Sequence, residues 1–150
     1  YENSNARARI RAEAVKDRSW PPTTGEFILT MKAEILEPMP FSPKLDPSSS
    51  GPIFEMCINT FKPFTMPSII KRWNEKLTER LRLSPLIGVF ATDVGELNRW
   101  THIWSYKTLD ERAAVKAAAV ASDLWPIRSD DIVIGEETKI LLPAPFSPIQ

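Results

Sequence analysis

The sequence has few of the residues that build metal, phosphate and disulfide sites. It contains one cysteine, Cys57, which excludes an internal disulfide and any zinc site made of several cysteines. His102 is the only histidine, so a Ser-His-Asp triad could use this residue alone, and no Gly-x-Ser-x-Gly motif occurs. The five glycines are too widely spaced to form a phosphate-binding loop. No apolar run approaches the roughly 20 residues of a membrane-spanning helix, so we expect no transmembrane segment.

Neither positive nor negative charge is in excess. The 19 Lys and Arg residues equal the 19 Asp and Glu residues in number, which argues against a nucleic-acid partner. Hydrophobic residues make up 43% of the chain, enough to supply a core. Proline, in contrast, is abundant, with 14 residues, many of them in the stretches 38–52 and 143–148. These two stretches therefore predict extended tails.

The opening and closing stretches of the chain resemble each other. When Tyr1 is set against Tyr106 without a gap, residues 1–43 match residues 106–148 at many positions. The matches include Arg7 with Arg112, Trp20-Pro21 with Trp125-Pro126, Ile35-Leu36 with Ile140-Leu141, and Phe41-Ser42-Pro43 with Phe146-Ser147-Pro148. We therefore expect two copies of one helix–strand–tail segment.

This repeat predicts the domain organisation. Residues 1–43 are expected to be the C-terminal half of a first module, residues 44–52 a Pro/Ser linker, and residues 53–150 a complete second module. The first module lacks its early part in this sequence, so we expect upstream sequence, a protein partner or a second copy of the chain to complete it.

The second module shows alternating strand and helix patterns. Apolar residues recur with period two in the strands and at helical spacing in the helices. The predicted strands cover 53–61, 86–92, 97–106 and 132–142, and the predicted helices cover 67–81 and 108–121. Thr65 is a candidate N-cap of the first helix, and Thr108 with Glu111 forms a capping box for the second. A bulge is expected at Gly135.

The resulting order is β-α-β-β-α-β, the ferredoxin-like arrangement of the α+β class. Its helices cover one face of an antiparallel sheet and leave the other face bare. A second sheet commonly covers such a face.

Several motifs follow one another in the second module. The stretch from Gly95 to Tyr106 contains a Gly-x-Leu-Asn turn and a His-x-Trp strand, and an Arg-Ala helix follows at 110–115. The chain then ends in Leu141-Leu-Pro-Ala-Pro-Phe-Ser-Pro148. These motifs, in this order, resemble the signature of the NIPSNAP family, and the ending is similar to the C-terminal tail of that family. The resemblance implies a dimeric α+β barrel built from ferredoxin-like modules, in tandem here. It also implies a mitochondrial setting, or alternatively a cytoplasmic one, and it supplies no catalytic residue and no cofactor.

The strand from Leu97 to Tyr106 contains the candidate site. Period-two geometry places Trp100, His102, Trp104 and Tyr106 on one face of this strand. These residues could line a pocket with one titratable group, His102. Alternatively, they fill the core and His102 hydrogen-bonds a neighbour, the interpretation favoured by how often large aromatic residues are buried for packing.

Other chemistry is weakly supported. Cys57 is expected to be a buried structural thiol rather than a nucleophile. No metal site is expected, because the carboxylate pairs Asp130-Asp131 and Glu136-Glu137 fit the solvated ends of a strand better. Phe41 and Phe146 are expected to anchor their tails against their own or a neighbouring module.

Two functional hypotheses follow. The favoured one is a non-enzymatic interaction or assembly protein, such as a mitochondrial adaptor or an accessory subunit of a larger complex. The alternative is a small-molecule-binding protein or an oxygenase-like enzyme that uses the aromatic and His102 face.

Overall fold

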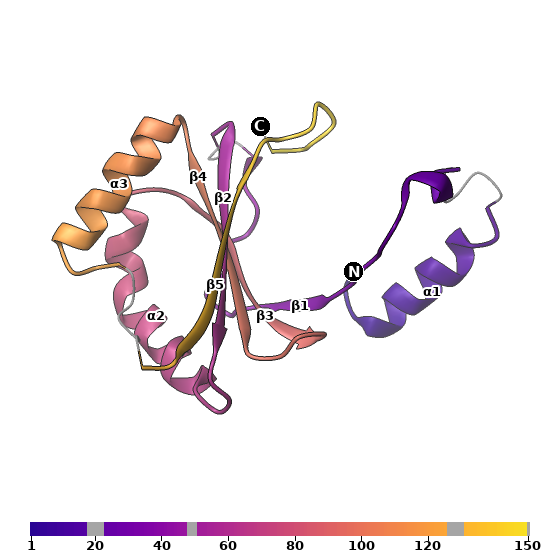
Figure 1. Cartoon of the computed structure of the whole chain (residues 1–150), viewed down its shortest axis with the longest axis horizontal. Coiled ribbons are helices and arrows are strands. Elements are labelled where there is room, and N and C mark those ends of the chain that lie inside the picture. Colours follow the sequence, from indigo (N-terminus) through magenta and orange to yellow (C-terminus); the bar gives the residue numbers. More distant parts are fainter. Residues whose placement is uncertain (18–22, 48–50, 126–130, 150) are drawn as a thin grey trace. The chain divides into compact units, whose positions relative to one another are not determined.

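The computed structural model describes residues 1–17, 23–47, 51–125 and 131–149. Two compact units are present, Tyr1–Ala33 and Glu34–Gln150 (Figure 1). Residues 34–43 therefore group with the second unit, whereas the division into repeated modules remains a prediction. Within the described residues, every helix is too short or too polar to cross a membrane.

The first unit consists of the helix α1 (Ser4–Ala14) and a short 3-10 turn, η1 (Gly25–Phe27). Asn3 caps the helix, since its side-chain oxygen accepts a hydrogen bond of 2.9 Å from the Ala6 amide. The helix was expected in this region. The predicted Trp20-Pro21 pair lies outside the described residues.

The second unit contains the complete β-α-β-β-α-β order. Its elements are β1 (Ile35–Pro38), β2 (Ile53–Phe61), α2 (Met66–Leu81), β3 (Leu86–Val94), β4 (Arg99–Tyr106), α3 (Leu109–Ala121) and β5 (Val133–Leu141). The strands form one antiparallel sheet in the order β1-β3-β4-β2-β5. The ferredoxin-like α+β prediction is confirmed, with β1 added at the β3 edge.

Element boundaries differ from the predictions by one to two residues. β3 ends at Val94 and β4 begins at Arg99, so the connecting turn has the expected length but lies two residues further along the chain. Gly95 has a φ of 132° and Asn98 a φ of 60°, conformations that reverse the chain tightly. The irregularity expected at Gly135 is present, since the register between β2 and β5 shifts between Thr60 and Phe61.

The two predicted helix caps have different outcomes. The Thr108 hydroxyl accepts a 3.0 Å hydrogen bond from the Glu111 amide, and the Glu111 carboxylate accepts one from the Lys107 amide, which confirms the capping box. Thr65 also precedes its helix, but its side chain does not cap it. Its backbone is already helical, and its hydroxyl donates to the Lys62 carbonyl instead.

The substitution Thr108→Ala is therefore expected to lower the free energy of unfolding by about 1 kcal/mol. Thr65→Ala is the matched control, because it removes the same atoms at the start of a helix without removing a cap, and we expect a loss of at most about 0.5 kcal/mol. Urea denaturation of both variants measures the difference. Equal losses would contradict the assignment of the caps.

The core lies between the sheet and the helices α2 and α3, which cover the same face (Figure 1). Trp73 of α2 contacts the aromatic rings of β4, with ring centroids 5.3 Å from Trp100 and 5.0 Å from His102. On β2, Glu55 contacts α3 through ion pairs. Strand alternation then places Phe54, Met56 and Ile58 on the sheet face away from the helices.

Candidate functional site

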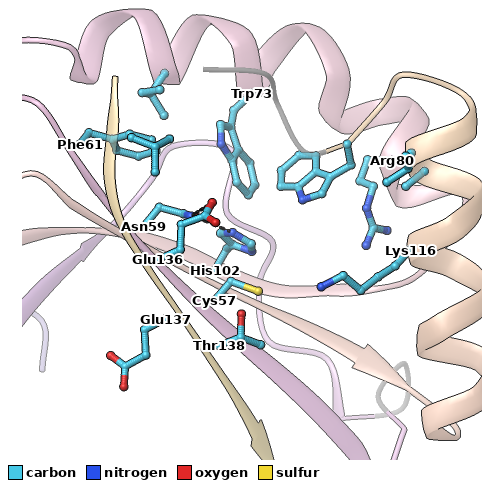
Figure 2. Close-up of a pocket in the computed structure, with 15 residues that line it drawn as sticks. Cys57, Asn59, Phe61, Trp73, Arg80, His102, Lys116, Glu136, Glu137 and Thr138 are labelled. Atoms are coloured by element: carbon cyan, nitrogen blue, oxygen red, sulfur yellow. Dashed lines mark hydrogen bonds between the residues drawn. The ribbon is translucent and has the colours of Figure 1, made fainter. Parts of the chain in front are cut away.

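A cavity of about 230 Å³ lies between the sheet and the two helices (Figure 2). Residues from both helices, three strands and the segment after α3 contribute to its wall. Those that determine its chemistry are Cys57, Asn59, Trp73, His102, Lys116 and Trp125.

The structure places all four candidate residues of β4 on the helix-covered face, but only His102 borders the cavity. Trp100, Trp104 and Tyr106 are at most 2% exposed and belong to the core. Sequence patterns missed Lys116 and Trp125, because these residues reach the cavity only through tertiary packing. That the cavity is a functional pocket stays a prediction.

Both nitrogens of the His102 ring have hydrogen-bond partners. The Trp104 indole N–H donates to Nδ1 at 2.7 Å, so the proton of the neutral ring is on Nε2, which donates to Asn59 Oδ1 at 3.2 Å. Burial lowers the pKa of His102 to about 3. The imidazole is therefore neutral at physiological pH and already engaged, which disfavours it as a general base.

The thiol of Cys57 is protonated. Burial, together with the negative charge of Glu55, raises its pKa to about 11. Thr138 lies opposite Cys57 in the β2–β5 ladder. The raised pKa agrees with the prediction of a structural thiol, since nucleophilic cysteines need a lowered pKa, but Cys57 is half-buried at the cavity wall and not buried as expected.

A buried polar network next to the cavity was not predicted. Glu55 is 2% exposed, and its carboxylate accepts hydrogen bonds from Arg112, from Lys116 at 3.1 Å and from the Tyr106 hydroxyl at 3.2 Å. Burial alone raises the pKa of this carboxyl, but the hydrogen bonds from the two cations outweigh it, and the pKa is lowered overall. Glu55 is therefore held as an anion.

Arg80 extends this network from helix α2. It is 2% exposed, its guanidinium carbon lies 3.9 Å from the centroid of the Trp104 ring, and it donates to the Ser84 hydroxyl at 2.8 Å. It also reaches the Tyr106 hydroxyl at 3.4 Å. Burial raises the pKa of Tyr106 to about 12, so the phenol stays neutral. Each of these groups is held in one charge state.

The described residues contain no group of three or more His, Cys, Asp or Glu side chains that could hold a metal ion. The prediction that Glu136 and Glu137 lie at the end of a strand is wrong, because both lie within β5. Glu136 accepts a 3.1 Å hydrogen bond from the Asn59 amide, and Glu137 pairs with Lys139 at 3.1 Å. Asp130 lies outside the described residues.

A second feature joins two segments that are distant in the sequence. Beyond β1, the Met39 amide donates to the Val89 carbonyl at 3.0 Å, and the Val89 amide donates to the Ser42 hydroxyl at 3.0 Å. The Phe41 ring packs against Trp73 and Trp100 at centroid distances of 6.4 and 6.2 Å. We call the surface formed by Val89, Trp73 and Trp100 the tail site. Phe41 thus anchors its tail as expected, whereas Phe146 is 90% exposed.

Comparison with known proteins gives consistent results. The model of the NIPSNAP family matches residues 54–148. The protein NipSnap homolog 1 of Danio rerio is 25% identical over 128 residues, which cover 83% of this chain and 46% of that relative. The human NipSnap homolog 3B is 25% identical over 166 residues, covering 100% of this chain and 64% of the relative. The chain thus spans about half the length of the zebrafish relative.

Solved structures show the same fold. A NIPSNAP family protein from Agrobacterium tumefaciens has a TM-score of 0.60 and 31% identity, and the match covers 65% of this chain and 98% of that chain. An uncharacterized NIPSNAP domain protein from Burkholderia xenovorans has a TM-score of 0.59 and 25% identity, covering 64% and 98% of the two chains. Both matches cover about two thirds of this chain and nearly all of the solved chain.

Proposed function

The chain is a member of the NIPSNAP family, and on that premise we propose that it works as a non-enzymatic interaction and assembly protein. In this proposal it serves as an adaptor or an accessory subunit of a larger complex. The mitochondrial setting that we propose for it rests on the family resemblance alone. The partner is a second copy of the chain or another protein with a sheet of the same kind.

The observation that carries this proposal is that residues 35–43 add a strand to the sheet and an aromatic ring to the core. β1 pairs with β3 as an additional strand, and Phe41 fills the aromatic core beside Trp73. Both features come from residues 35–43, outside the module that begins with β2. Addition of a strand at a sheet edge together with an aromatic anchor is a common form of protein recognition.

The chemistry of the cavity supports a role without catalysis. Both nitrogens of His102 are engaged, the Cys57 thiol is protonated, and the Glu55 carboxylate is neutralised by cations. A general base needs a pKa near the working pH. None of these three side chains meets that requirement.

The sheet face away from the helices is the proposed assembly surface, and its proposed occupant is the same face of a second copy. Met56 and Ile103 are half-buried partners in the β2–β4 ladder and form its apolar centre. Arg99, Glu137 and Lys139 supply charges of both signs around this centre. A surface with both signs can pair with itself across a twofold axis.

We therefore expect the purified chain to sediment as a dimer, and Ile103→Lys to weaken its association at least tenfold, since dimerisation would then remove the charged lysine at the apolar centre from water. Leu81→Lys is the charge-matched control at the end of α2, where the leucine is 44% exposed, and it should leave the dimer intact. Analytical ultracentrifugation measures both. A well-folded monomer of the unsubstituted chain would contradict the proposal.

The cavity favours a second candidate function, the binding of a small organic molecule. Its volume of about 230 Å³ and the rings of Trp73 and Trp125 would suit a fragment-sized aromatic ligand. Such a ligand should quench tryptophan fluorescence, and Cys57→Phe, which fills the cavity, should abolish the quenching. Equal quenching in both proteins would argue against binding at this position.

A further inference from the structure

The C-terminal segment repeats the sequence that occupies the tail site. Residues 38–43 read Pro-Met-Pro-Phe-Ser-Pro and residues 143–148 read Pro-Ala-Pro-Phe-Ser-Pro, so five of the six positions are identical. The one difference sets Met39 against Ala144. Their environments differ, because Phe41 packs against two tryptophans whereas Phe146 is 90% exposed.

The contacts of the first segment use groups that the second also has. Met39 contributes a backbone amide, Ser42 a hydroxyl oxygen and Phe41 a ring. The corresponding groups belong to Ala144, Ser147 and Phe146. Because the amide contact is made by the backbone, the change from methionine to alanine preserves it.

The two segments also share a local conformation. The Ser42 amide donates to the Met39 carbonyl at 2.8 Å, and the Ser147 amide donates to the Ala144 carbonyl at the same 2.8 Å. The C-terminal segment forms a hook beyond β5 (Figure 1), with the Phe146 ring 90% exposed. A segment that already contains this turn loses less conformational entropy when it binds with the turn in place.

We propose that residues 143–148 form a docking segment that binds the tail site of a second NIPSNAP-type module, one whose own tail site is open. Phe146 inserts beside the residues equivalent to Trp73 and Trp100, and the Ser147 hydroxyl accepts the hydrogen bond of the residue equivalent to Val89. The inference rests on the proposed function, because it identifies a contact by which modules join.

A module of this family fits the segment better than a domain that recognises proline-rich peptides. Such domains bind extended polyproline II segments without internal hydrogen bonds. Residues 144–147 are instead closed by the turn between Ala144 and Ser147. Their sequence matches a ligand that a module of this family already holds.

The test uses the full chain with the tail site weakened. Phe41→Ala removes the ring that fills the site, and a fluorescein-labelled peptide of residues 140–150 then serves as the probe. Fluorescence polarisation is expected to show at least tenfold tighter binding to the Phe41→Ala chain than to the unsubstituted chain, whose site is filled. The same peptide with Phe146→Ala should bind at least tenfold more weakly. Absence of binding to the folded variant, or equal binding of the two peptides, would overturn the proposal.

A second measurement does not depend on the stability of the Phe41→Ala chain. Met39→Ala makes the segment in the tail site identical to residues 143–148. We expect this variant to keep a cooperative thermal transition within about 5 °C of the unsubstituted chain. Loss of cooperative folding would show that the C-terminal sequence does not fit the site, and the proposal would fall.

Neither readout requires dimerisation through the sheet. Sedimentation as a monomer would therefore overturn the proposed function, while peptide binding would still decide this inference.

Discussion

Replacing Glu55 with glutamine is expected to lower the free energy of unfolding by about 3–5 kcal/mol, the range typical of breaking a buried ion pair. The carboxylate is 2% exposed and is the negative centre that compensates Arg112 and Lys116. Its oxygen also accepts the Tyr106 hydroxyl, which in turn contacts the buried Arg80. Glutamine keeps the shape but removes the negative charge that Arg80 faces through the Tyr106 hydroxyl.

Lys116→Gln is the matched control for this prediction. The Lys116 side chain is 47% exposed, so water replaces much of what its ion pair with Glu55 contributes, and we expect a loss of about 1 kcal/mol or less. Urea denaturation of both variants at neutral pH provides the comparison. If Glu55→Gln costs no more than Lys116→Gln, the buried network does not stabilise the fold.

Much of the fold could be predicted because its elements have strong local signals. Period-two alternation located β4, helical spacing located α2, and the Thr108 and Glu111 pair located the start of α3. The pairing of β1 with the β3 edge could not be predicted in this way. It depends on a contact between Leu36 and Thr92, which are far apart in the sequence and carry no pairing signal.

The candidate site was only partly accessible to sequence patterns. Alternation correctly places His102 on the helix-covered face, but no local pattern shows that Lys116 and Trp125 meet it across a cavity. Glu55 is the clearest example. A carboxylate that alternates with apolar residues in a strand looks solvent-exposed, and it is buried here because α3 brings two cations to it.

Phe41 and Phe146 show a further limit of local reasoning. Both lie in the same Pro-Phe-Ser-Pro context, yet one is packed against two tryptophans and the other is 90% exposed. The sequence predicts extended tails, whereas a turn closes each of them, and it predicts an anchored ring in both tails, which holds for Phe41 but not for Phe146. Whether such a ring is packed or exposed depends on which surface lies next to its tail, and the local sequence does not encode that.

The stability of the chain is expected to fall by about 2 kcal/mol between pH 7 and pH 5 because of His102. The pKa of this residue falls from 6.5 to about 3 in the folded chain, mainly because of burial, while Glu55 opposes the shift and the cations Arg80 and Lys116 add to it. Between these two pKa values the unfolded chain binds a proton that the folded chain does not. Stability is therefore present above pH 6.5 and is lost as the pH falls.

His102→Gln tests this prediction, since it removes the chain's only histidine. The variant should be less stable at pH 7, because the ring no longer contacts Trp73, but its stability should change little between pH 7 and pH 5. The lowered pKa of Glu55 means that its contribution is lost only as the pH falls below 4.5, outside this window. Urea denaturation at several pH values measures both slopes. If the free energy of unfolding changed with pH in the same way in both proteins, His102 would not be the source of the slope, because the variant lacks it.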